Sequence, residues 1–135
     1  MKNLVSFDIF ESKSGDQIEM LTQRYAHLPI DPDFDFFELG KYHDLVVKIL
    51  NPKIVSLKKP EWNIYKGSHH WGKKTDYIPE REIWIVSGLR AKNFRRILNH
   101  EIIEREMMRA LEEEKGMDRE IAWNQAHFYV KELGF

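Results

Sequence analysis

The chain has 135 residues, of which 42% are hydrophobic and 13% aromatic, a size and composition suited to one compact domain with a buried core. Its 21 basic and 22 acidic residues nearly cancel, which argues against a protein that binds nucleic acid or an anionic membrane through its net charge. The longest apolar runs fall far short of the roughly 20 residues of a membrane-spanning helix. The N-terminus meets the charge of Asp8 too early for a signal peptide, so we expect a cytoplasmic protein.

The chain contains no cysteine. A disulfide framework is therefore excluded, and a tight transition-metal site has to be built from His, Asp and Glu side chains. This narrows the search for ligands to the six histidines and their acidic neighbours. The charged fraction of 32%, dominated by Lys, Arg and Glu, is compatible with a thermophilic source.

The N-terminal half is predicted to contain two strands and two helices. Residues 2–10 alternate between apolar and polar side chains, as a half-buried strand does, and residues 15–27 carry apolar side chains at helical spacing. Residues 36–49 show a second amphipathic helical pattern, which stops at Asn51-Pro52. Residues 53–58 alternate again, so we expect a second strand there.

The C-terminal half begins with residues 61–79, which are rich in Gly, Lys and aromatic residues and are interpreted as a long loop or an irregular hairpin arm. Residues 82–86 have the best strand pattern of the chain, and residues 94–114 favour a helix. Gly116 is placed to end that helix, and a final helix is expected over 118–133, capped by its first residue. The elements indicate a single α+β domain with a small, mostly antiparallel sheet packed against helices and a C-terminal antiparallel helical hairpin.

Three polar side chains lie on the face of the 94–114 helix that should be apolar. At about 100° per residue, His100, Glu101 and Glu104 fall on the same face as Phe94 and Met108. An ionised carboxylate that faces a core costs free energy unless it is paired, hydrogen-bonded or bound to a metal. The pattern therefore predicts a functional site on this helix.

His127 can join this group from the final helix. Glu104 lies 12 residues before Gly116 and His127 lies 11 after it, so the two are level in an antiparallel helix pair. His100 lies one helical turn from Glu104. Two imidazoles and one carboxylate suit a catalytic zinc ion, or another divalent metal, that keeps one position for water, and Glu101 is placed to act as the general base.

The order of a strand, a connector and a helix bearing His-Glu resembles the core of minimal zinc metallopeptidases of the zincin type, including the gluzincin branch. The resemblance implies that His100 is the first zinc ligand and Glu101 the base. It also implies that the preceding strand is an edge that pairs with an extended peptide substrate. That strand contains Ile83, Trp84 and Ile85.

The family motif His-Glu-x-x-His is present here as His-Glu-x-x-Glu. Glu104 stands at the position of the second histidine, and His127 stands for the downstream ligand, which is commonly glutamate. The set of two histidines and one glutamate is kept with two positions exchanged. The resemblance thus implies a zinc-dependent hydrolase that acts on peptide bonds.

The C-terminal pattern is also similar to that of short uncharacterised proteins of archaea, bacteria and their viruses. The matching features are Tyr77, the strand around Ile83 to Ile85, His100 to Glu104, Gly116-Met117 and Ala126-His127. This resemblance implies no particular activity.

Three residues of the 61–79 segment are auxiliary candidates. His69 or His70 could supply a further ligand or a hydrogen-bond donor, and only one of the pair is expected to reach the site because adjacent side chains point in different directions. Tyr77 could donate a hydrogen bond to an oxyanion. A solvated aromatic loop is the alternative for all three.

The alternative for the whole motif is a polar network without catalysis. His100 and Glu104 would then form a buried ion pair, and Glu101 would reach Arg105 one turn away. The protein would be a structural or interaction protein, with a structural metal or none. It would bind partners through aromatic side chains such as Phe34, Phe36, Phe37 and Phe128.

Overall fold

The structure is a computed structural model that describes residues 15–135, so the strand predicted over residues 2–10 lies outside the described part. Residues 15–26 are helical, as predicted. The elements that follow are β1 (Phe36–Tyr42), β2 (Leu45–Leu50), α2 (Pro52–Val55), the 3-10 helix η1 (Pro60–Asn63), β3 (Gly67–His69), β4 (Glu82–Val86), α3 (Ala91–Arg109), the π-helical turn η2 (Ala110–Glu114) and α4 (Arg119–Glu132).

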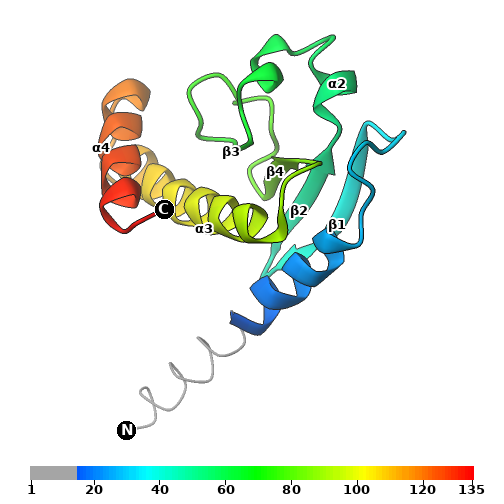
Figure 1. Ribbon diagram of the computed structural model, residues 1–135. Helices are drawn as coiled ribbons and strands as arrows, with labels where there is room; N and C mark the ends of the chain where they lie inside the picture. The colour runs from blue at the N-terminus through cyan, green and yellow to red at the C-terminus, as the bar shows by residue number, and fades with distance from the viewer. Residues whose placement is uncertain (1–14) are drawn as a thin grey trace, which may run out of the picture.

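The four strands form one mixed sheet in the order β1-β2-β4-β3 (Figure 1). β1 pairs with β2 and β3 pairs with β4 in antiparallel orientation, whereas β2 and β4 are parallel. The predicted α+β class with a mostly antiparallel sheet is therefore confirmed. Within the described residues, the helices are too short or too polar to traverse a lipid bilayer.

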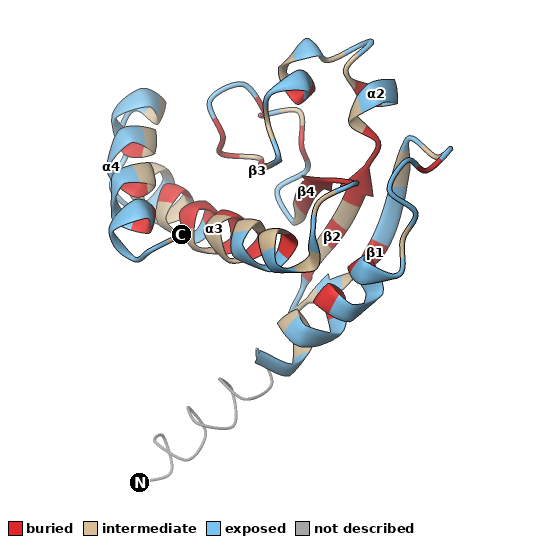
Figure 2. Cartoon of the chain, viewed as in Figure 1, coloured by how far each residue is buried: buried red, intermediate tan, exposed pale blue. Residues whose placement is uncertain are grey.

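The 15–26 helix and α3 cover one face of the sheet, and α2, η1 and the loops around them cover the other. Alternate residues of β4 point to opposite faces, as they must in a strand. Ile83 and Ile85 pack with the 15–26 helix and with Phe94 and Leu98 of α3. Trp84 and Val86 of β4 pack on the opposite face with η1 and the loops around it. Figure 2 shows the buried positions concentrated in β2, β4 and the side of α3 that faces them.

The helix predicted over residues 36–49 is wrong, because this segment is the hairpin of β1 and β2. Burial along β2 follows a period of two, with Leu45, Val47 and Ile49 fully covered, and β-branched residues favour such a pleated surface. The two-residue turn between the strands holds His43 at φ 54, a left-handed conformation that a continuous helix does not contain. The apolar residues of the segment fit both periods, and the turn decides between them.

The strand predicted over residues 53–58 is also wrong, because the chain forms the single helical turn α2 there. The Asn51 side chain accepts a hydrogen bond from the Lys53 N–H at 3.0 Å, and Pro52 occupies the first helical position. Asn at the N-cap and Pro at the first position are start signals for a helix. Asn51-Pro52 therefore begins a helix, whereas the sequence analysis interpreted it as the end of one.

The strand over residues 82–86 and the helical hairpin that follows it are confirmed, with the first helix beginning at Ala91. β4 occupies residues 82–86, and α3 continues through η2 to a glycine, Gly116, with φ 62. Asp118 caps α4 by accepting a hydrogen bond from the Glu120 N–H. The two helices pack through Met108 of α3 and two small residues of α4, Ala122 and Ala126.

Candidate metal centre

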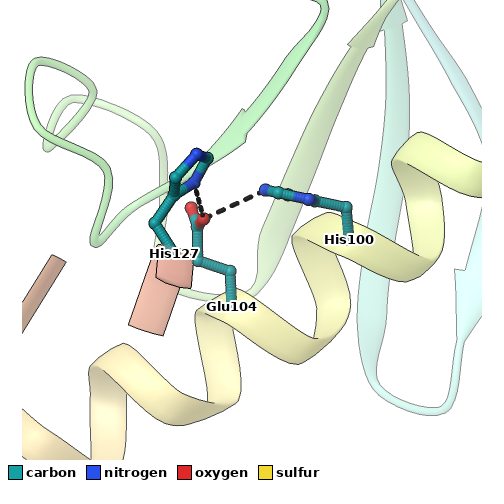
Figure 3. A group of neighbouring side chains, drawn as sticks. All are labelled: His100, Glu104 and His127. Atoms are coloured by element: carbon teal, nitrogen blue, oxygen red, sulfur yellow. Dashed lines mark hydrogen bonds and ion pairs between the residues drawn. The ribbon is translucent and has the colours of Figure 1, made fainter. Parts of the chain in front are cut away.

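Two helices bring three potential metal ligands to one point. The Glu104 Oε2 atom of α3 lies 3.0 Å from His100 Nε2 and 2.9 Å from His127 Nδ1 of α4. All three ligand atoms lie within 4.8 Å of one another. Figure 3 shows the two imidazole rings directed at the same carboxylate oxygen. The convergence expected from the spacing around Gly116 is therefore present in the structure.

The donor set fits a divalent ion of the zinc type. Ligand atoms about 2.1 Å from zinc lie about 3.4 Å apart in a tetrahedron. The two contacts with Glu104 Oε2, at 2.9 and 3.0 Å, are a few tenths of an ångström shorter than this spacing, and all three ligand atoms lie within 4.8 Å of one another. All three residues line one cavity, through which water or a substrate could reach an ion held by them.

Glu104 remains a carboxylate although it is almost completely buried. Burial is the largest influence and by itself would raise the pKa of Glu104, but hydrogen bonds with His100, His69 and His127 outweigh it and bring the pKa well below its usual range. A buried carboxylate is stable only with such partners. Glu104 is therefore held in the form that a cation requires.

Glu101 differs sharply from Glu104, although it is buried to the same degree. Within the described residues its Oε2 atom has no hydrogen-bond partner. Burial and, second, the charge of Glu104 raise the pKa of Glu101 well above its usual value. The alternative in which Glu101 pairs with Arg105 is not found, because Arg105 donates instead to the carbonyl oxygen of Glu80. Glu101 is therefore a buried carboxyl group whose Oε2 atom has no hydrogen-bond partner in the described part of the chain.

These residues line a cavity of about 400 Å³. His100, Glu101 and Glu104 form its wall on α3, and Trp123 and His127 form its wall on α4. The indole of Trp123 stacks on the His127 ring, with ring centroids 4.3 Å apart and planes inclined by 11°, and this contact fixes the orientation of the imidazole. The candidate ligands are thus open to a small molecule or a chain segment.

His69 supports the site from β3. The side chain is fully buried, and its Nδ1 accepts a hydrogen bond from the Trp71 N–H at 3.1 Å. Burial also lowers the pKa of His69, so the ring is neutral and its single proton lies on Nε2. That proton is donated to Glu104 Oε1 at 3.0 Å. His69 therefore holds one oxygen of Glu104 and leaves the other, Oε2, for His100 and His127.

A tight turn after β3 keeps His69 in place. The carbonyl oxygen of His69 accepts hydrogen bonds from Thr75 Oγ1 at 2.8 Å and from the Gly72 N–H at 3.1 Å. A Cβ atom on Gly72 would lie 2.2 Å from Thr75 Oγ1 and 2.5 Å from Ser68 Oγ, which only a glycine avoids. The turn thus closes tightly around the backbone of His69.

Two of the auxiliary candidates lie away from the site. His70 is hydrogen-bonded through Nδ1 to the carbonyl oxygen of Ile78 at 2.8 Å and does not line the cavity. The Tyr77 hydroxyl donates to Glu61 Oε2 and accepts from Trp62 Nε1, each at 2.7 Å. Tyr77 packs on the face of the sheet opposite α3, so the predicted role as an oxyanion donor is wrong.

The strand predicted as the substrate edge is not an edge. Ile83, Trp84 and Ile85 are paired with β2 on one side and with β3 on the other. The edge nearest the site is β3, which has no recognisable strand pattern because it is only three residues long. The glycine at its start, Gly67, was the available signal.

Gly67 brings the edge strand close to α3. A Cβ atom at this position would lie 2.8 Å from Ile97 Cγ2 and 3.2 Å from Glu101 Cγ, so only glycine permits this approach without displacement. Lys66 bonds to β4 through its carbonyl oxygen, and residues alternate along an antiparallel ladder. The backbone N–H and C=O of Gly67 therefore face outward, at the lining of the cavity.

The geometry above is the basis for any functional conclusion, since comparison with known proteins supplies none. No protein-family model, curated protein or solved structure matches this chain.

Proposed function

We propose that this protein is a zinc-dependent hydrolase of the zincin type that acts on peptide bonds. The observation that carries the proposal is the arrangement around Glu104. Two imidazole nitrogens and a carboxylate oxygen converge within 4.8 Å at the wall of a cavity. The buried Glu101 lines the same cavity, and its Oε2 atom has no hydrogen-bond partner among residues 15–135. A carboxyl group buried without a partner is costly, and a role in the reaction accounts for its retention.

His100, Glu104 and His127 would hold the metal, which when bound supplies Lewis acidity toward a carbonyl oxygen and a water molecule. Glu101 lines the same cavity and would accept the proton of the attacking water at Oε2, then return it to the leaving amine. His69 would keep Glu104 in position through Oε1. Each role is carried by a side chain whose geometry suits it.

The choice of a peptide substrate is supported by β3. The outward N–H and C=O groups of Gly67 lie along the cavity and can pair with an extended chain, as an edge strand does with a peptide. This replaces the role first assigned to the strand of Ile83 to Ile85 with the edge that the fold leaves open.

Metal analysis of the full-length protein, purified without a metal-affinity tag, tests the first part of the proposal. We expect about one zinc ion per chain, as for a site with one set of three protein ligands. His100→Ala should lose the ion, whereas the control His27→Ala, an exposed histidine outside the site, should keep it. A metal-free wild-type protein from zinc-replete cells would refute the proposal.

Hydrolysis of a mixture of fluorogenic peptides tests the second part. Glu101→Gln should retain zinc and lose turnover by at least about a hundredfold, because general-base catalysis contributes about 10² to 10⁴ in rate. Glu120→Gln, a change of the same kind at an exposed position on α4, should leave turnover unchanged. Unchanged hydrolysis in Glu101→Gln would remove Glu101 from the mechanism.

The second candidate function is a structural or interaction protein, possessing a polar network or a structural metal. It is favoured by the three histidines that already surround Glu104, since the network has partners without any ion. Phe37 and Phe128 are exposed and would provide the contact surface, whereas Phe34 and Phe36 are half-buried. Self-association by sedimentation, together with the absence of turnover, would favour this candidate.

A further inference from the structure

Four basic side chains line the cavity that contains the candidate metal centre: Lys66, Lys73, Arg96 and Lys131. They come from both sides of β3, from α3 and from α4. Arg96 precedes His100 by one helical turn and Lys131 follows His127 by one turn, so each helix presents a cation beside its imidazole. All four side chains are exposed.

None of these four cations has a carboxylate partner among residues 15–135. The acidic side chains that line the cavity are Glu101 and Glu104, both buried at its base and both assigned to the metal centre. Elsewhere on the helices such pairs are present: the neighbouring Arg95 pairs with Glu19, and Arg119 pairs with Glu112. The cavity is therefore surrounded by unpaired positive charge although the chain as a whole has a formal charge of -1.

The aromatic walls of the cavity strengthen the electrostatic effect of these cations on a bound ligand. Tyr65, Trp123 and Phe135 line it together with the cations, and the Lys73 ammonium lies 4.6 Å from the centroid of the Trp123 ring. Charged groups at a recess with aromatic walls act through a medium of lower dielectric than water. A divalent ion at the ligands would offset the two buried carboxylates, so the positive charge of the rim would remain uncompensated.

We infer that the cavity selects acidic peptides, with Asp or Glu side chains flanking the segment that lies along β3. The inference rests on the proposed function and adds the class of substrate. An extended peptide would pair with the outward backbone groups of Gly67. Its carboxylates would contact Arg96 and Lys131 on the two helices, and Lys66 and Lys73 on either side of β3. Phosphate alone would satisfy the cations but would leave the strand edge unused.

Peptide binding to the full-length Glu101→Gln protein, supplied with zinc, tests the inference without turnover. The probes are three fluorescein-labelled peptides of equal length, one rich in Glu, one neutral and one rich in Lys, followed by fluorescence anisotropy. We expect the acidic peptide to bind at least about tenfold more tightly than the basic one. Its affinity should fall as salt rises from about 50 to 200 mM, because exposed charges are screened.

Variants that remove single charges from the Glu101→Gln protein show which cations cause the preference for the acidic peptide. Arg96→Gln and Lys131→Gln should each weaken binding of the acidic peptide by about threefold to tenfold and leave the neutral peptide unchanged. The matched control is Lys92→Gln, which removes the same charge from an exposed position of α3 that does not line the cavity.

Equal affinity for the acidic and basic peptides, no binding of any peptide, or an equal loss in Lys92→Gln would overturn the inference. Tighter binding of a single-stranded oligonucleotide of the same charge would also overturn it. Zinc content and turnover are measured separately, so a zinc-loaded, active protein without charge preference refutes only this inference. Selective binding of acidic peptides by a protein that takes up no zinc refutes only the proposed function.

Discussion

Glu104→Gln distinguishes the proposed metal site from the polar network that the same residue maintains. The amide oxygen of the new side chain can accept the proton of His69 Nε2, which now goes to Oε1 at 3.0 Å. The amide nitrogen would take the place of Oε2 and can donate to the nitrogens of His100 and His127, now at 3.0 and 2.9 Å. All three contacts survive in neutral form, but the anionic ligand is lost.

The effect on the metal-free protein should be small. Hydrogen bonds to a charged group contribute about 1.5–3 kcal/mol and neutral ones about 0.5–1.5 kcal/mol, so each of the three contacts weakens by about 1 kcal/mol. Removal of a buried charge from Glu104 offsets part of this loss, because burial opposes its ionisation more than any single interaction favours it. We expect the metal-free variant to unfold within about 2 kcal/mol of the metal-free wild type.

The response to zinc should differ strongly between the two proteins. A ligand at 100 times its dissociation constant stabilises the folded state by about 2.7 kcal/mol. With an unfolding entropy of about 2.1 cal/mol/K per residue over the chain, this corresponds to a rise of about 10 °C in Tm. Differential scanning calorimetry of chelator-treated samples, with and without added zinc, should show this rise in the wild type and none in Glu104→Gln. An equal rise in both proteins would show that Glu104 is not a ligand.

Three further predictions concern groups that position the site or the fold. Tyr25→Phe should lower the free energy of unfolding, measured in urea, by about 1–3 kcal/mol, because it leaves the buried Val86 carbonyl oxygen and the half-buried Leu89 N–H without this partner. The exposed control Tyr129→Phe should cost nothing measurable. Burial raises the pKa of Tyr25 to about 12, so the contribution of Tyr25 to stability is complete below pH 10 and is lost between about pH 10 and 12. In Tyr25→Phe the free energy of unfolding should fall less over this pH range. An unchanged dependence on pH would contradict this role of Tyr25. Gly67→Ala should destabilise the fold by about 1–3 kcal/mol, because the new Cβ would lie 2.8 Å from Ile97 Cγ2. Adding Ile97→Ala to the same chain should recover part of this stability, and strictly additive effects of the two substitutions would argue against the clash. His69→Leu should weaken zinc binding by about 10- to 100-fold in a competition titration, and His69→Gln should restore most of it, because its amide N–H can replace the Nε2 donor; equal weakening by both would assign His69 a packing role alone.

The candidate metal centre was predictable because its geometry is local in the sequence. His100 and Glu104 lie one turn apart on a helix without Pro or Gly, and this fixes their separation. His127 follows through a short connection ended by Gly116, so the return of the chain sets its level relative to Glu104. The structure places these three residues as the spacing required.

The role of His69 was only partly predictable. The sequence indicated that one residue of His69-His70 would reach the site, because adjacent side chains diverge. Which of the two histidines reaches the site depends on the register of β3 against β4, and these strands are separated by residues 70–81. Non-local register of this kind leaves little trace in a three-residue strand, and the same limitation hid the edge position of Gly67.

The N-terminal half shows where periodicity misleads. The apolar side chains of residues 36–49 satisfy helical spacing, yet β-branched Val46, Val47 and Ile49 and the turn at His43 favour a hairpin. Asn51-Pro52 was predicted to end a helix but begins α2, because the same dipeptide can end one helix and start another. The hairpin packs against the 15–26 helix through Leu45, Val47 and Ile49, whereas α2 packs on the other face of the sheet through Val55.

The candidate metal centre depends on the position of α4, the last helix. α4 packs on α3 through a cluster that includes Ala122, Ala126 and Met108, and His127 links it to Glu104. When α4 separates from α3, one of the three ligands leaves with it. A bound ion would therefore stabilise the packing of α4 on α3. The amide hydrogens of α4 would exchange with solvent much more slowly in the metal-bound protein than in the metal-free one.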